Sequence, residues 1–263
     1  MSNNLSQNIM EQMIFITGFA RGGTSWLRDC IGCHPDVATL PKERTIFRDI
    51  KNYDNIPELL EPEVKKLLKG KKYVVNKAPA NAPFIAKASK YFDSTKFLFI
   101  IRDPRDVLTS HQRGTKSWMK GKNSEVKGCM EKVEKYFNGF ELAKNQKNLK
   151  LIRYEDLHQN FFETMTDILG FLKLNTSKKI IKNIYKEVNF KAQTSRANKE
   201  NQNSAKRKGV VGDWGICLSN EDKDWFKKSK YFQNFFLNNN YDFREITYEN
   251  IVLAMKSAGA NFL

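Results

Sequence analysis

Up to Asp156 the chain repeats one pattern, in which a short apolar run is followed by a polar stretch with helical spacing. Apolar runs without polar alternation are typical of strands buried on both faces of a sheet. Such strands are expected at Met13–Thr17, Tyr73–Asn76, Lys96–Ile101 and Leu149–Arg153. Between and after them, apolar residues recur at the spacing of amphipathic helices. Helices are expected at Thr24–Cys33, Pro57–Leu68, Ala82–Tyr91, Pro104–Arg113, Val126–Lys144, Phe161–Lys173 and Ser177–Val188.

Strands that alternate with helices predict an α/β fold, with a central parallel sheet covered by helices on both faces. We expect a three-layer α/β/α domain like that of P-loop nucleoside triphosphatases, and a single domain over residues 1–263. The polar residues 1–12 are expected to form a flexible N-terminus. Residues 189–208 are polar and basic, which predicts a mobile loop. A peripheral helix is expected at Thr247–Ser257.

A glycine-rich turn joins the first predicted strand to the first predicted helix, with the sequence Gly18-Phe-Ala-Arg-Gly-Gly-Thr-Ser-Trp26. Glycine adopts backbone angles that other residues avoid, so successive N–H groups can point at one anion in front of the helix dipole. The turn differs from the P-loop G-x-x-x-x-G-K-[ST], because Thr24 stands where the lysine would. A phosphate site without that lysine predicts a donor other than a nucleoside triphosphate. Arg21 is the cation of this loop.

A second basic segment, Arg102-Asp-Pro-Arg-Asp-Val-Leu-Thr-Ser110, follows the third predicted strand. Pro104 suits the first turn of a helix, which would place Ser110 two turns further along it. An arginine fork and a hydroxyl at a strand end would suit a second phosphate. The alternative is an arginine that ends its strand in a structural ion pair with Asp103 or Asp106.

A third segment, Arg207-Lys-Gly-Val-Val-Gly-Asp-Trp214, lies far downstream. Two cations followed by spaced glycines allow backbone amides and side chains to surround one anion. Taken alone, Lys206-Arg207-Lys208 is more often a solvated charge run or a targeting signal.

In order and spacing these motifs, from Ile14 to Trp214, resemble those of the sulfotransferases that use 3′-phosphoadenosine 5′-phosphosulfate. The resemblance implies that the first loop binds the 5′-phosphosulfate, that Trp26 packs on adenine, and that the other two segments bind the 3′-phosphate. It implies a donor site formed by Arg21, Gly22, Gly23, Thr24, Ser25, Trp26, Arg102, Ser110, Arg207, Lys208 and Gly209. The product would be adenosine 3′,5′-bisphosphate. No metal is expected, because this donor has no γ-phosphate.

Two cations are candidates for stabilising negative charge on the leaving phosphate. Arg21 stands where many of the resembling enzymes have lysine. Lys77, in Asn76-Lys-Ala-Pro79, matches the N-K-x-P or E-K-x-P lysine of relatives that modify glycans or protein tyrosine. The resemblance therefore implies catalytic roles for both side chains.

The acceptor hydroxyl also needs a general base. Relatives that act on small phenols use a histidine just after the catalytic lysine, where this chain has Ala78. Glycan-modifying relatives carry a glutamate shortly after an H-P-D-V segment, and here Glu43 follows His34-Pro-Asp-Val37. Glu43 is therefore the candidate base. The alternative is a surface glutamate paired with Lys42 or Arg44.

Charge and composition limit the remaining possibilities. Lys and Arg number 45 against 29 Asp and Glu, a net charge of +16, so the protein should attract anions. No apolar run is long enough to cross a bilayer, and the polar start does not resemble a secretion signal, which together predict a cytoplasmic protein. Four cysteines without a disulfide framework agree with a reducing compartment.

Three functions follow from these observations, in order of preference. The first is transfer of a sulfuryl group to a hydroxyl of a carbohydrate, glycolipid or small metabolite. The second is a P-loop kinase or nucleotide phosphotransferase, from which the loop departs at Thr24 and for which Asp103 would be the residue to examine as a magnesium ligand. The third is a basic nucleic-acid-binding protein. Cations placed at strand ends argue against nucleic acid as a partner, because such a footprint would spread over one face.

Overall fold

The computed structural model describes residues 9–114, 120–189 and 211–241. The chain forms two compact units. Unit 1 comprises Met1–Ile101 and Glu134–Lys199, and unit 2 comprises Arg102–Val133 and Glu200–Leu263.

The described residues of unit 1 form a five-stranded parallel sheet in the order β2-β3-β1-β4-β5. In this order β1 is central and pairs with β3 and β4, so that Ile16 lies opposite Lys77 and Gly18 opposite Ile100. The α/β fold and the four predicted strands are confirmed, whereas the short edge strand β2 was not predicted. The strands are β1 (Met13–Gly18), β2 (Val37–Thr39), β3 (Tyr73–Lys77), β4 (Lys96–Ile101) and β5 (Leu149–Arg153).

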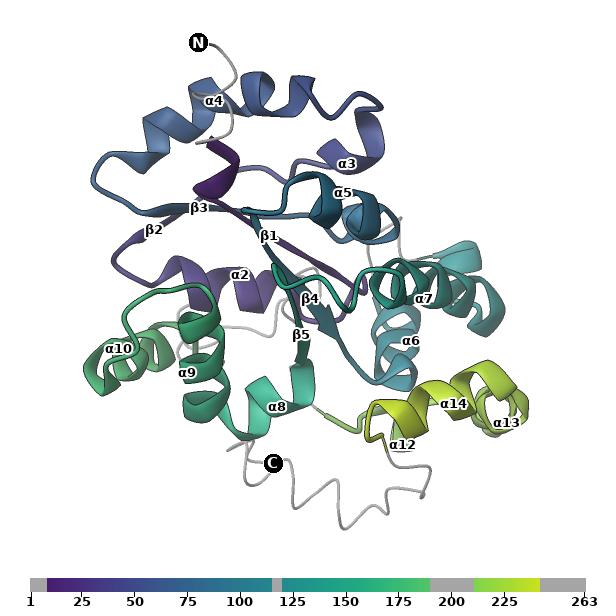
Figure 1. Ribbon diagram of the computed structural model, residues 1–263. Coiled ribbons are helices and arrows are strands. Elements are labelled where there is room, and N and C mark those ends of the chain that lie inside the picture. Colours follow the sequence, from purple (N-terminus) through teal and green to yellow (C-terminus); the bar gives the residue numbers. More distant parts are fainter. Residues whose placement is uncertain (1–8, 115–119, 190–210, 242–263) are drawn as a thin grey trace. The chain divides into compact units, whose positions relative to one another are not determined.

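Helices cover both faces of this sheet. In Figure 1, α4 and α5 lie above the sheet, and α2, α9 and α10 lie below it. The expected helix at Ala82–Tyr91 begins instead as a 3-10 turn, and its α-helical part starts at Ile85. The helices of unit 1 are α2 (Thr24–Gly32), α3 (Ile46–Asp49), α4 (Asn55–Leu68), η1 (Pro79–Phe84), α5 (Ile85–Tyr91), α8 (Tyr154–Gln159), α9 (Phe161–Phe171) and α10 (Lys178–Val188).

Aromatic side chains fill much of the core of unit 1. Every residue of β1 is buried, as expected for a central strand. The Phe15 ring packs 4.7 Å from that of Phe47 and 5.6 Å from that of Phe97, between centroids. Large rings of this kind contribute strongly to folding through their buried apolar area. This packing gives the strand ends a rigid support.

The described part of unit 2 is helical. The Arg105 guanidinium of α6 lies 3.8 Å from the ring centroid of Trp214 and 4.5 Å from that of Phe236, a cation–π arrangement. Phe226, Phe232 and Phe236 pack together where α13 meets α14. The helices are α6 (Pro104–Gln112), η3 (Gly121–Asn123), α12 (Trp214–Cys217), α13 (Asn220–Lys228) and α14 (Lys230–Asn238), and α7 (Val126–Glu141) continues from unit 2 into unit 1.

Several expectations concern the ends and loops of the chain. Within residues 1–12, Ile9 and Met10 are buried, and the Thr95 hydroxyl donates to the Met10 carbonyl at 2.8 Å. Apart from Asn189, the loop expected at 189–208 lies outside the described residues, as does the helix expected at Thr247–Ser257. No helix within the described ranges is long and apolar enough to cross a membrane.

Candidate active site

The glycine bend after β1 takes backbone conformations that glycine permits. Gly18 has φ +132°, and a Cβ at this position would overlap the Ile100 carbonyl oxygen of β4. Gly23 has φ +95°, and a Cβ there would overlap the Tyr154 ring. Arg21 also has a positive φ, 68°, which non-glycine residues adopt rarely. The bend is therefore sharply turned and closely packed.

The bend leads directly into the N-terminus of α2. Gly23 is the N-cap and has no side chain with which to cap the helix, and no acidic residue lies in the first turn. The first N–H groups of a helix lack partners within it, so those of Thr24 and Ser25 can meet an anion. The Gly22 N–H donates instead to the Phe19 carbonyl at 2.8 Å, which shapes the bend.

Trp26 projects from α2 into an aromatic cluster. Its ring centroid lies 5.4 Å from that of Tyr154 and 6.1 Å from that of His158, and the side chain is half-buried. Tyr154 begins α8 directly after β5, so the cluster joins two strand ends of the same sheet. The predicted role of Trp26 toward adenine stays a prediction.

Lys77 and Glu43 form an ion pair at the end of β3. Lys77 lies opposite Ile16, two residues before Gly18, so this pair and the glycine bend share the carboxyl edge of the sheet. The Lys77 side chain is 6% exposed and that of Glu43 is 50% exposed, which leaves the carboxylate accessible to a second molecule. Arg44 pairs with Glu63 instead, at 2.7 Å. Glu43 thus pairs with Lys77, while Arg44, one of the two partners in the alternative interpretation, pairs with Glu63.

The electrostatics of Lys77 are unusual for a lysine. Burial and, to a smaller extent, the neighbouring Arg28 guanidinium lower the pKa of its ammonium to about 8, while Asp29 opposes the shift. Contact with the Glu43 carboxylate also favours the charged form. Lys77 is thus a desolvated cation that meets a carboxylate at its tip.

Two buried asparagines that the sequence did not single out hold the segment around Glu43. The Asn76 side chain accepts from the Arg44 N–H at 3.0 Å and donates to the Arg44 carbonyl at 2.8 Å. Asn81 donates to the same carbonyl at 3.1 Å and accepts from the Phe47 N–H at 3.2 Å. Asn76 belongs to the motif Asn76-Lys-Ala-Pro79, but a motif alone does not show which backbone groups a buried side chain binds.

In unit 2, Arg102 and Ser110 are both buried. The Arg102 guanidinium lies 3.4 Å from the Asp106 carboxylate, so the ion pair that formed the alternative reading of Arg102 is present. The Asp103 carboxylate pairs instead with Arg105 at 2.7 Å, and it caps α6 by accepting from the Arg105 N–H at 2.8 Å. Those bonds occupy the carboxylate that a magnesium site would need.

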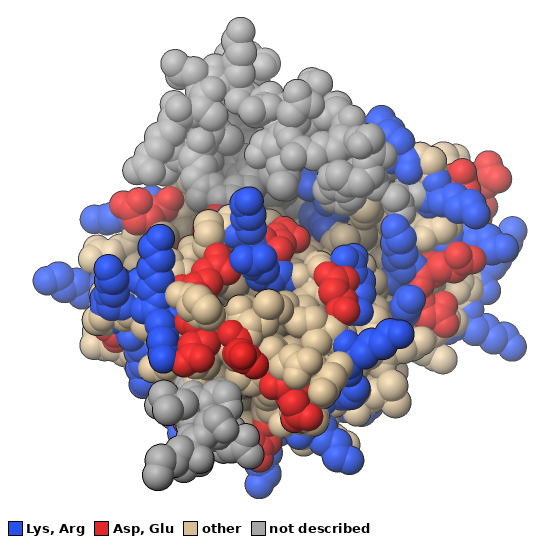
Figure 2. Space-filling view, turned by 90° about the horizontal axis from the view of Figure 1, so that it is seen from above, with Lys and Arg blue, Asp and Glu red and all other residues tan. Residues whose placement is uncertain are grey.

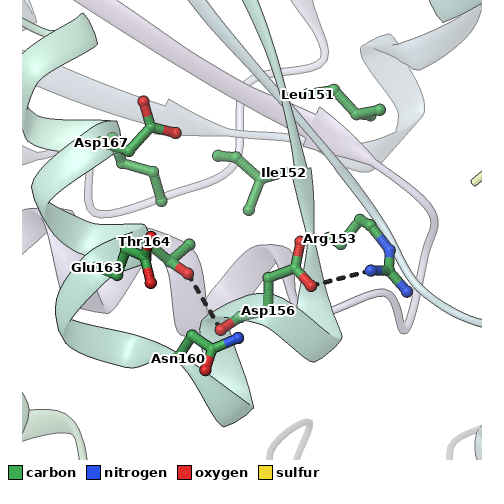
Figure 3. Close-up of a pocket in the computed structure, with 9 residues that line it drawn as sticks. Leu151, Ile152, Arg153, Asp156, Asn160, Glu163, Thr164 and Asp167 are labelled. Atoms are coloured by element: carbon green, nitrogen blue, oxygen red, sulfur yellow. Dashed lines mark hydrogen bonds and ion pairs between the residues drawn. The ribbon is translucent and has the colours of Figure 1, made fainter. Parts of the chain in front are cut away.

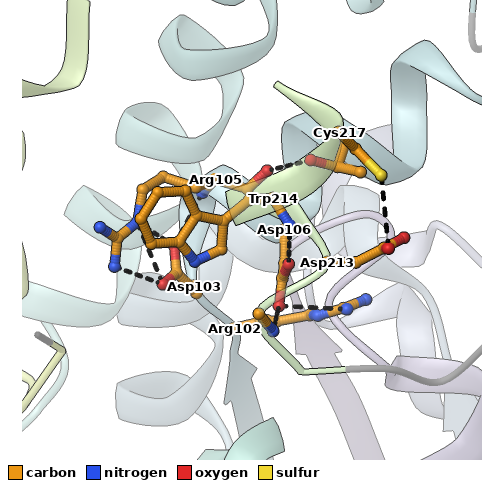
Figure 4. Close-up of polar contacts among 9 residues, drawn as sticks. Arg102, Asp103, Arg105, Asp106, Asp213, Trp214 and Cys217 are labelled. Atoms are coloured by element: carbon orange, nitrogen blue, oxygen red, sulfur yellow. Dashed lines mark hydrogen bonds and ion pairs between the residues drawn. The ribbon is translucent and has the colours of Figure 1, made fainter. Parts of the chain in front are cut away.

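Asp106 links the start of α6 to a distant part of the chain. Its carboxylate accepts from the N–H groups of Gly212 at 2.9 Å and Trp214 at 3.1 Å (Figure 4). Burial raises the pKa of Asp106 to about 6, against the opposing effect of Arg102 and these two bonds. Arg207, Lys208 and Gly209, the remaining predicted donor residues, lie outside the described residues.

A pocket of about 420 Å³ beside β5, α8 and α9 contains none of the predicted site residues (Figure 3). Asp156, Glu163 and Asp167 contribute three carboxylates, against the single cation Arg153, which pairs with Asp156 at 2.9 Å. This lining does not suit an anionic donor. Across the described residues no group of three or more His, Cys, Asp or Glu is arranged to hold a metal, and the absence of a metal stays an expectation.

Comparison with known proteins supports the reading of these motifs. Sulfotransferase 6B1 of Danio rerio is 23% identical over 223 residues, which are 78% of this chain and 72% of that protein. Mouse sulfotransferase SULT7A1, solved with PAP, has a TM-score of 0.64 at 19% identity over 90% of this chain and 94% of that one. Retinol dehydratase, solved with androsterone and the inactive cofactor PAP, has a TM-score of 0.55 at 16% identity, covering 92% and 85%.

At these low sequence identities, the similarity to the solved structures establishes only the fold. The family is established by a match to a known protein family that covers most of the chain. The sulfotransferase domain family matches residues 11–243, which include the glycine bend, the Lys77 strand end and the Arg102 segment. The chain therefore belongs to the sulfotransferase family and is a sulfotransferase enzyme.

Proposed function

We propose that this sulfotransferase transfers a sulfuryl group from 3′-phosphoadenosine 5′-phosphosulfate to an acceptor hydroxyl, with Glu43 as general base and Lys77 and Arg21 as stabilising cations. The observation that carries the proposal is the Lys77–Glu43 pair beside the glycine bend. An acid–base group and a buried cation at one sheet edge are what this displacement requires. The cytoplasmic location inferred from the sequence stays a prediction.

The donor assignment is supported by the fit between an anion and the bend. A helix N-terminus without a capping side chain offers amides to the 5′-phosphosulfate, and Cβ atoms at Gly18 or Gly23 would have no room. In the proposal Arg102, Ser110, Arg207, Lys208 and Gly209 take the 3′-phosphate, as in the enzymes that the motifs resemble. PAP, which is adenosine 3′,5′-bisphosphate, is present in the structures of SULT7A1 and retinol dehydratase.

The donor supplies the sulfuryl group and departs as adenosine 3′,5′-bisphosphate. As the acceptor oxygen bonds to sulfur, the bond from sulfur to the 5′-phosphate oxygen breaks and its electron pair stays on that oxygen. Glu43 takes the hydroxyl proton, and the Lys77 ammonium stabilises the charge on the phosphate oxygen. Each charge that develops thus has a partner of opposite sign.

The proposed acceptor is a carbohydrate, a glycolipid or another small metabolite with a hydroxyl. Ala78 stands where a histidine base would follow Lys77, which favours the glutamate type of enzyme. Retinol dehydratase, solved with androsterone, supports hydroxyl-bearing small molecules as acceptors in this fold.

His34 is buried at a turn, where its ring contacts the Asp36 N–H and the Asn175 carbonyl, each at 3.1 Å, which suits a structural role.

The test begins with donor binding. Adenosine 3′,5′-bisphosphate should raise the melting temperature, because ligand at about 100 times its Kd stabilises the folded state by about 2.7 kcal/mol. ATP should do so far less. A larger shift with ATP would favour a P-loop phosphotransferase, and oligonucleotide binding that falls steeply with salt would favour the nucleic-acid reading.

Catalysis is tested with labelled sulfate donor and a panel of hydroxyl-bearing extracts and purified glycans. Glu43→Gln should lower kcat by about 10²–10⁴-fold, the usual contribution of a general base, while bisphosphate affinity changes little. Glu58→Gln, on the exposed side of α4, is the matched control and should leave kcat unchanged. Full activity of Glu43→Gln would exclude Glu43 as the base.

A further inference from the structure

The segment that carries Glu43 has no regular secondary structure of its own. Residues 41–45 lie between β2 and α3 and belong to neither a helix nor a strand. Backbone groups in such a segment need other partners when water is excluded. Here Asn76 and Asn81 provide them, and these two residues are 0% and 2% exposed.

The two amides act on the backbone of a single residue, Arg44. Asn76 binds both the N–H and the carbonyl of Arg44, and Asn81 adds a second donor to that carbonyl. Two bonds to one residue fix its orientation as well as its position. Since Arg44 is the next residue after Glu43, the direction in which the Glu43 side chain leaves the backbone is fixed with it.

The other contacts near Glu43 hold this segment less firmly than the two asparagines do. The Arg44 side chain pairs with Glu63, but the two side chains are 48% and 27% exposed. Ion pairs near the surface hold their partners weakly. The Glu43 carboxylate itself is half-exposed. The buried asparagines are therefore the stronger constraint on this segment.

We propose that Asn76 and Asn81 are positioning residues of sulfuryl transfer, which hold the Arg44 backbone so that the adjacent Glu43 carboxylate stays against Lys77. The inference rests on the proposed role of Glu43 as base. Asn76 directly precedes Lys77 on β3, so one strand end supplies both the cation and the clamp for its carboxylate partner. Asn81 reaches the same carbonyl from η1, which follows β3 by one residue.

The chemistry favours asparagine at these positions. An amide donates and accepts at once, as the bonds of Asn76 to the N–H and carbonyl of Arg44 require. An aspartate could accept from the N–H but would face the carbonyl with a second oxygen. Asn76→Asp is therefore expected to behave like Asn76→Ala and to provide no rescue.

The experiment is a double-mutant cycle on kcat, with bisphosphate affinity measured alongside. Asn76→Ala should lower kcat by about 10–100-fold and change the bisphosphate Kd by less than about twofold. In the Glu43→Gln background the same substitution should lower kcat by less than about twofold, because residues that act through one group are not additive. Asn81→Ala, which leaves Asn76 in place, should give a smaller loss with the same dependence on Glu43.

Asn148→Ala is the matched control. Asn148 is also a buried asparagine that binds two backbone carbonyls, those of Ser89 at 3.0 Å and Phe92 at 2.9 Å, but it lies before β5 at the opposite edge of the sheet. It should lower stability without a loss of kcat in the folded enzyme.

The possible failures are separable. If Glu43→Gln keeps full kcat, the proposed base is wrong. If it loses kcat but the Asn76→Ala loss is undiminished in its background, the positioning role is wrong. If Asn76→Ala does not fold, the Asn81→Ala cycle decides, and an additive or absent effect there overturns the inference.

Discussion

Lys77 illustrates how a single residue can be both buried and charged at a site. Its ammonium is desolvated at the end of β3, yet the tip of the side chain contacts the Glu43 carboxylate, which carries the opposite charge. Such sites shift pKa values because burial disfavours the charged form while a neighbouring carboxylate favours it. The lowered pKa of Lys77 should therefore affect the stability of the protein as well as the rate of the reaction.

The Lys77 pKa predicts a pH dependence of stability. The folded-state pKa of about 8 lies below the ordinary 10.5, so between these values the unfolded chain binds a proton here that the folded chain does not. The cost of burying the ammonium is therefore fully present below pH 8 and is relieved as pH rises toward 10.5. Relative to Lys77→Met, wild-type stability should rise by up to about 1.4 kcal/mol per pH unit in this window.

Urea unfolding at several pH values measures this difference. The comparison with Lys77→Met removes the titration of tyrosines and other lysines, which both proteins share. A difference that stays flat from pH 8 to 10.5, or that changes in the opposite direction, would contradict a lowered Lys77 pKa.

At the scale of elements, the sequence predicted the main strands, but it did not predict the short elements that lie between them. The predicted bounds of β4 and β5 match the structure, and β4 is a continuous apolar run after Lys96. The edge strand β2 has three residues, too few to show a period. Helices α3, α8 and α12 are single turns or little more, and tertiary contacts rather than their own periodicity stabilise them.

The glycine bend before α2 allows a matched pair of substitutions. Gly23→Ala would put a Cβ into the Tyr154 ring at φ +95°, and we expect a loss of stability of about 2 kcal/mol or more together with weaker bisphosphate binding. Gly170→Ala, in α9, has nothing within 4 Å and should stabilise the protein by about 0.5–1 kcal/mol. Thermal unfolding measures the stability of the two variants, and calorimetric titration measures their affinity for the bisphosphate. Equal behaviour of the two variants would contradict the packing argument.

At the scale of the whole molecule, the charge of +16 concerns attraction of anions rather than the fold. On the face of unit 1 that carries α4, basic and acidic side chains are interspersed and do not gather into one basic field (Figure 2). Among its charged residues, Glu61 pairs with Lys65, four positions along α4. This mixture suits a general attraction for small anions better than a nucleic-acid footprint on that face.

The net charge predicts how the donor associates. The association rate constant of adenosine 3′,5′-bisphosphate should fall several-fold between about 20 and 300 mM salt, while the dissociation rate constant changes less. Stopped-flow tryptophan fluorescence measures both rates, and uncharged adenosine is the control. An association rate that does not change with salt would mean that the net charge has no part in capture of the donor.

The sequence by itself determined the α/β class, the four main strands and the family, because these depend on local patterns: apolar runs, glycine turns and ordered motifs. It also led to Lys77 and Glu43 through resemblance. Tertiary structure alone decided that these two side chains meet, that Arg102 pairs with Asp106, and that Asn76 and Asn81 hold the Glu43 segment. The contacts of Glu43 and of the two asparagines join residues that are distant in the chain, and the pairing of Arg102 decides between the two partners that the local sequence left open. Their geometry depends on burial and packing that no local pattern encodes.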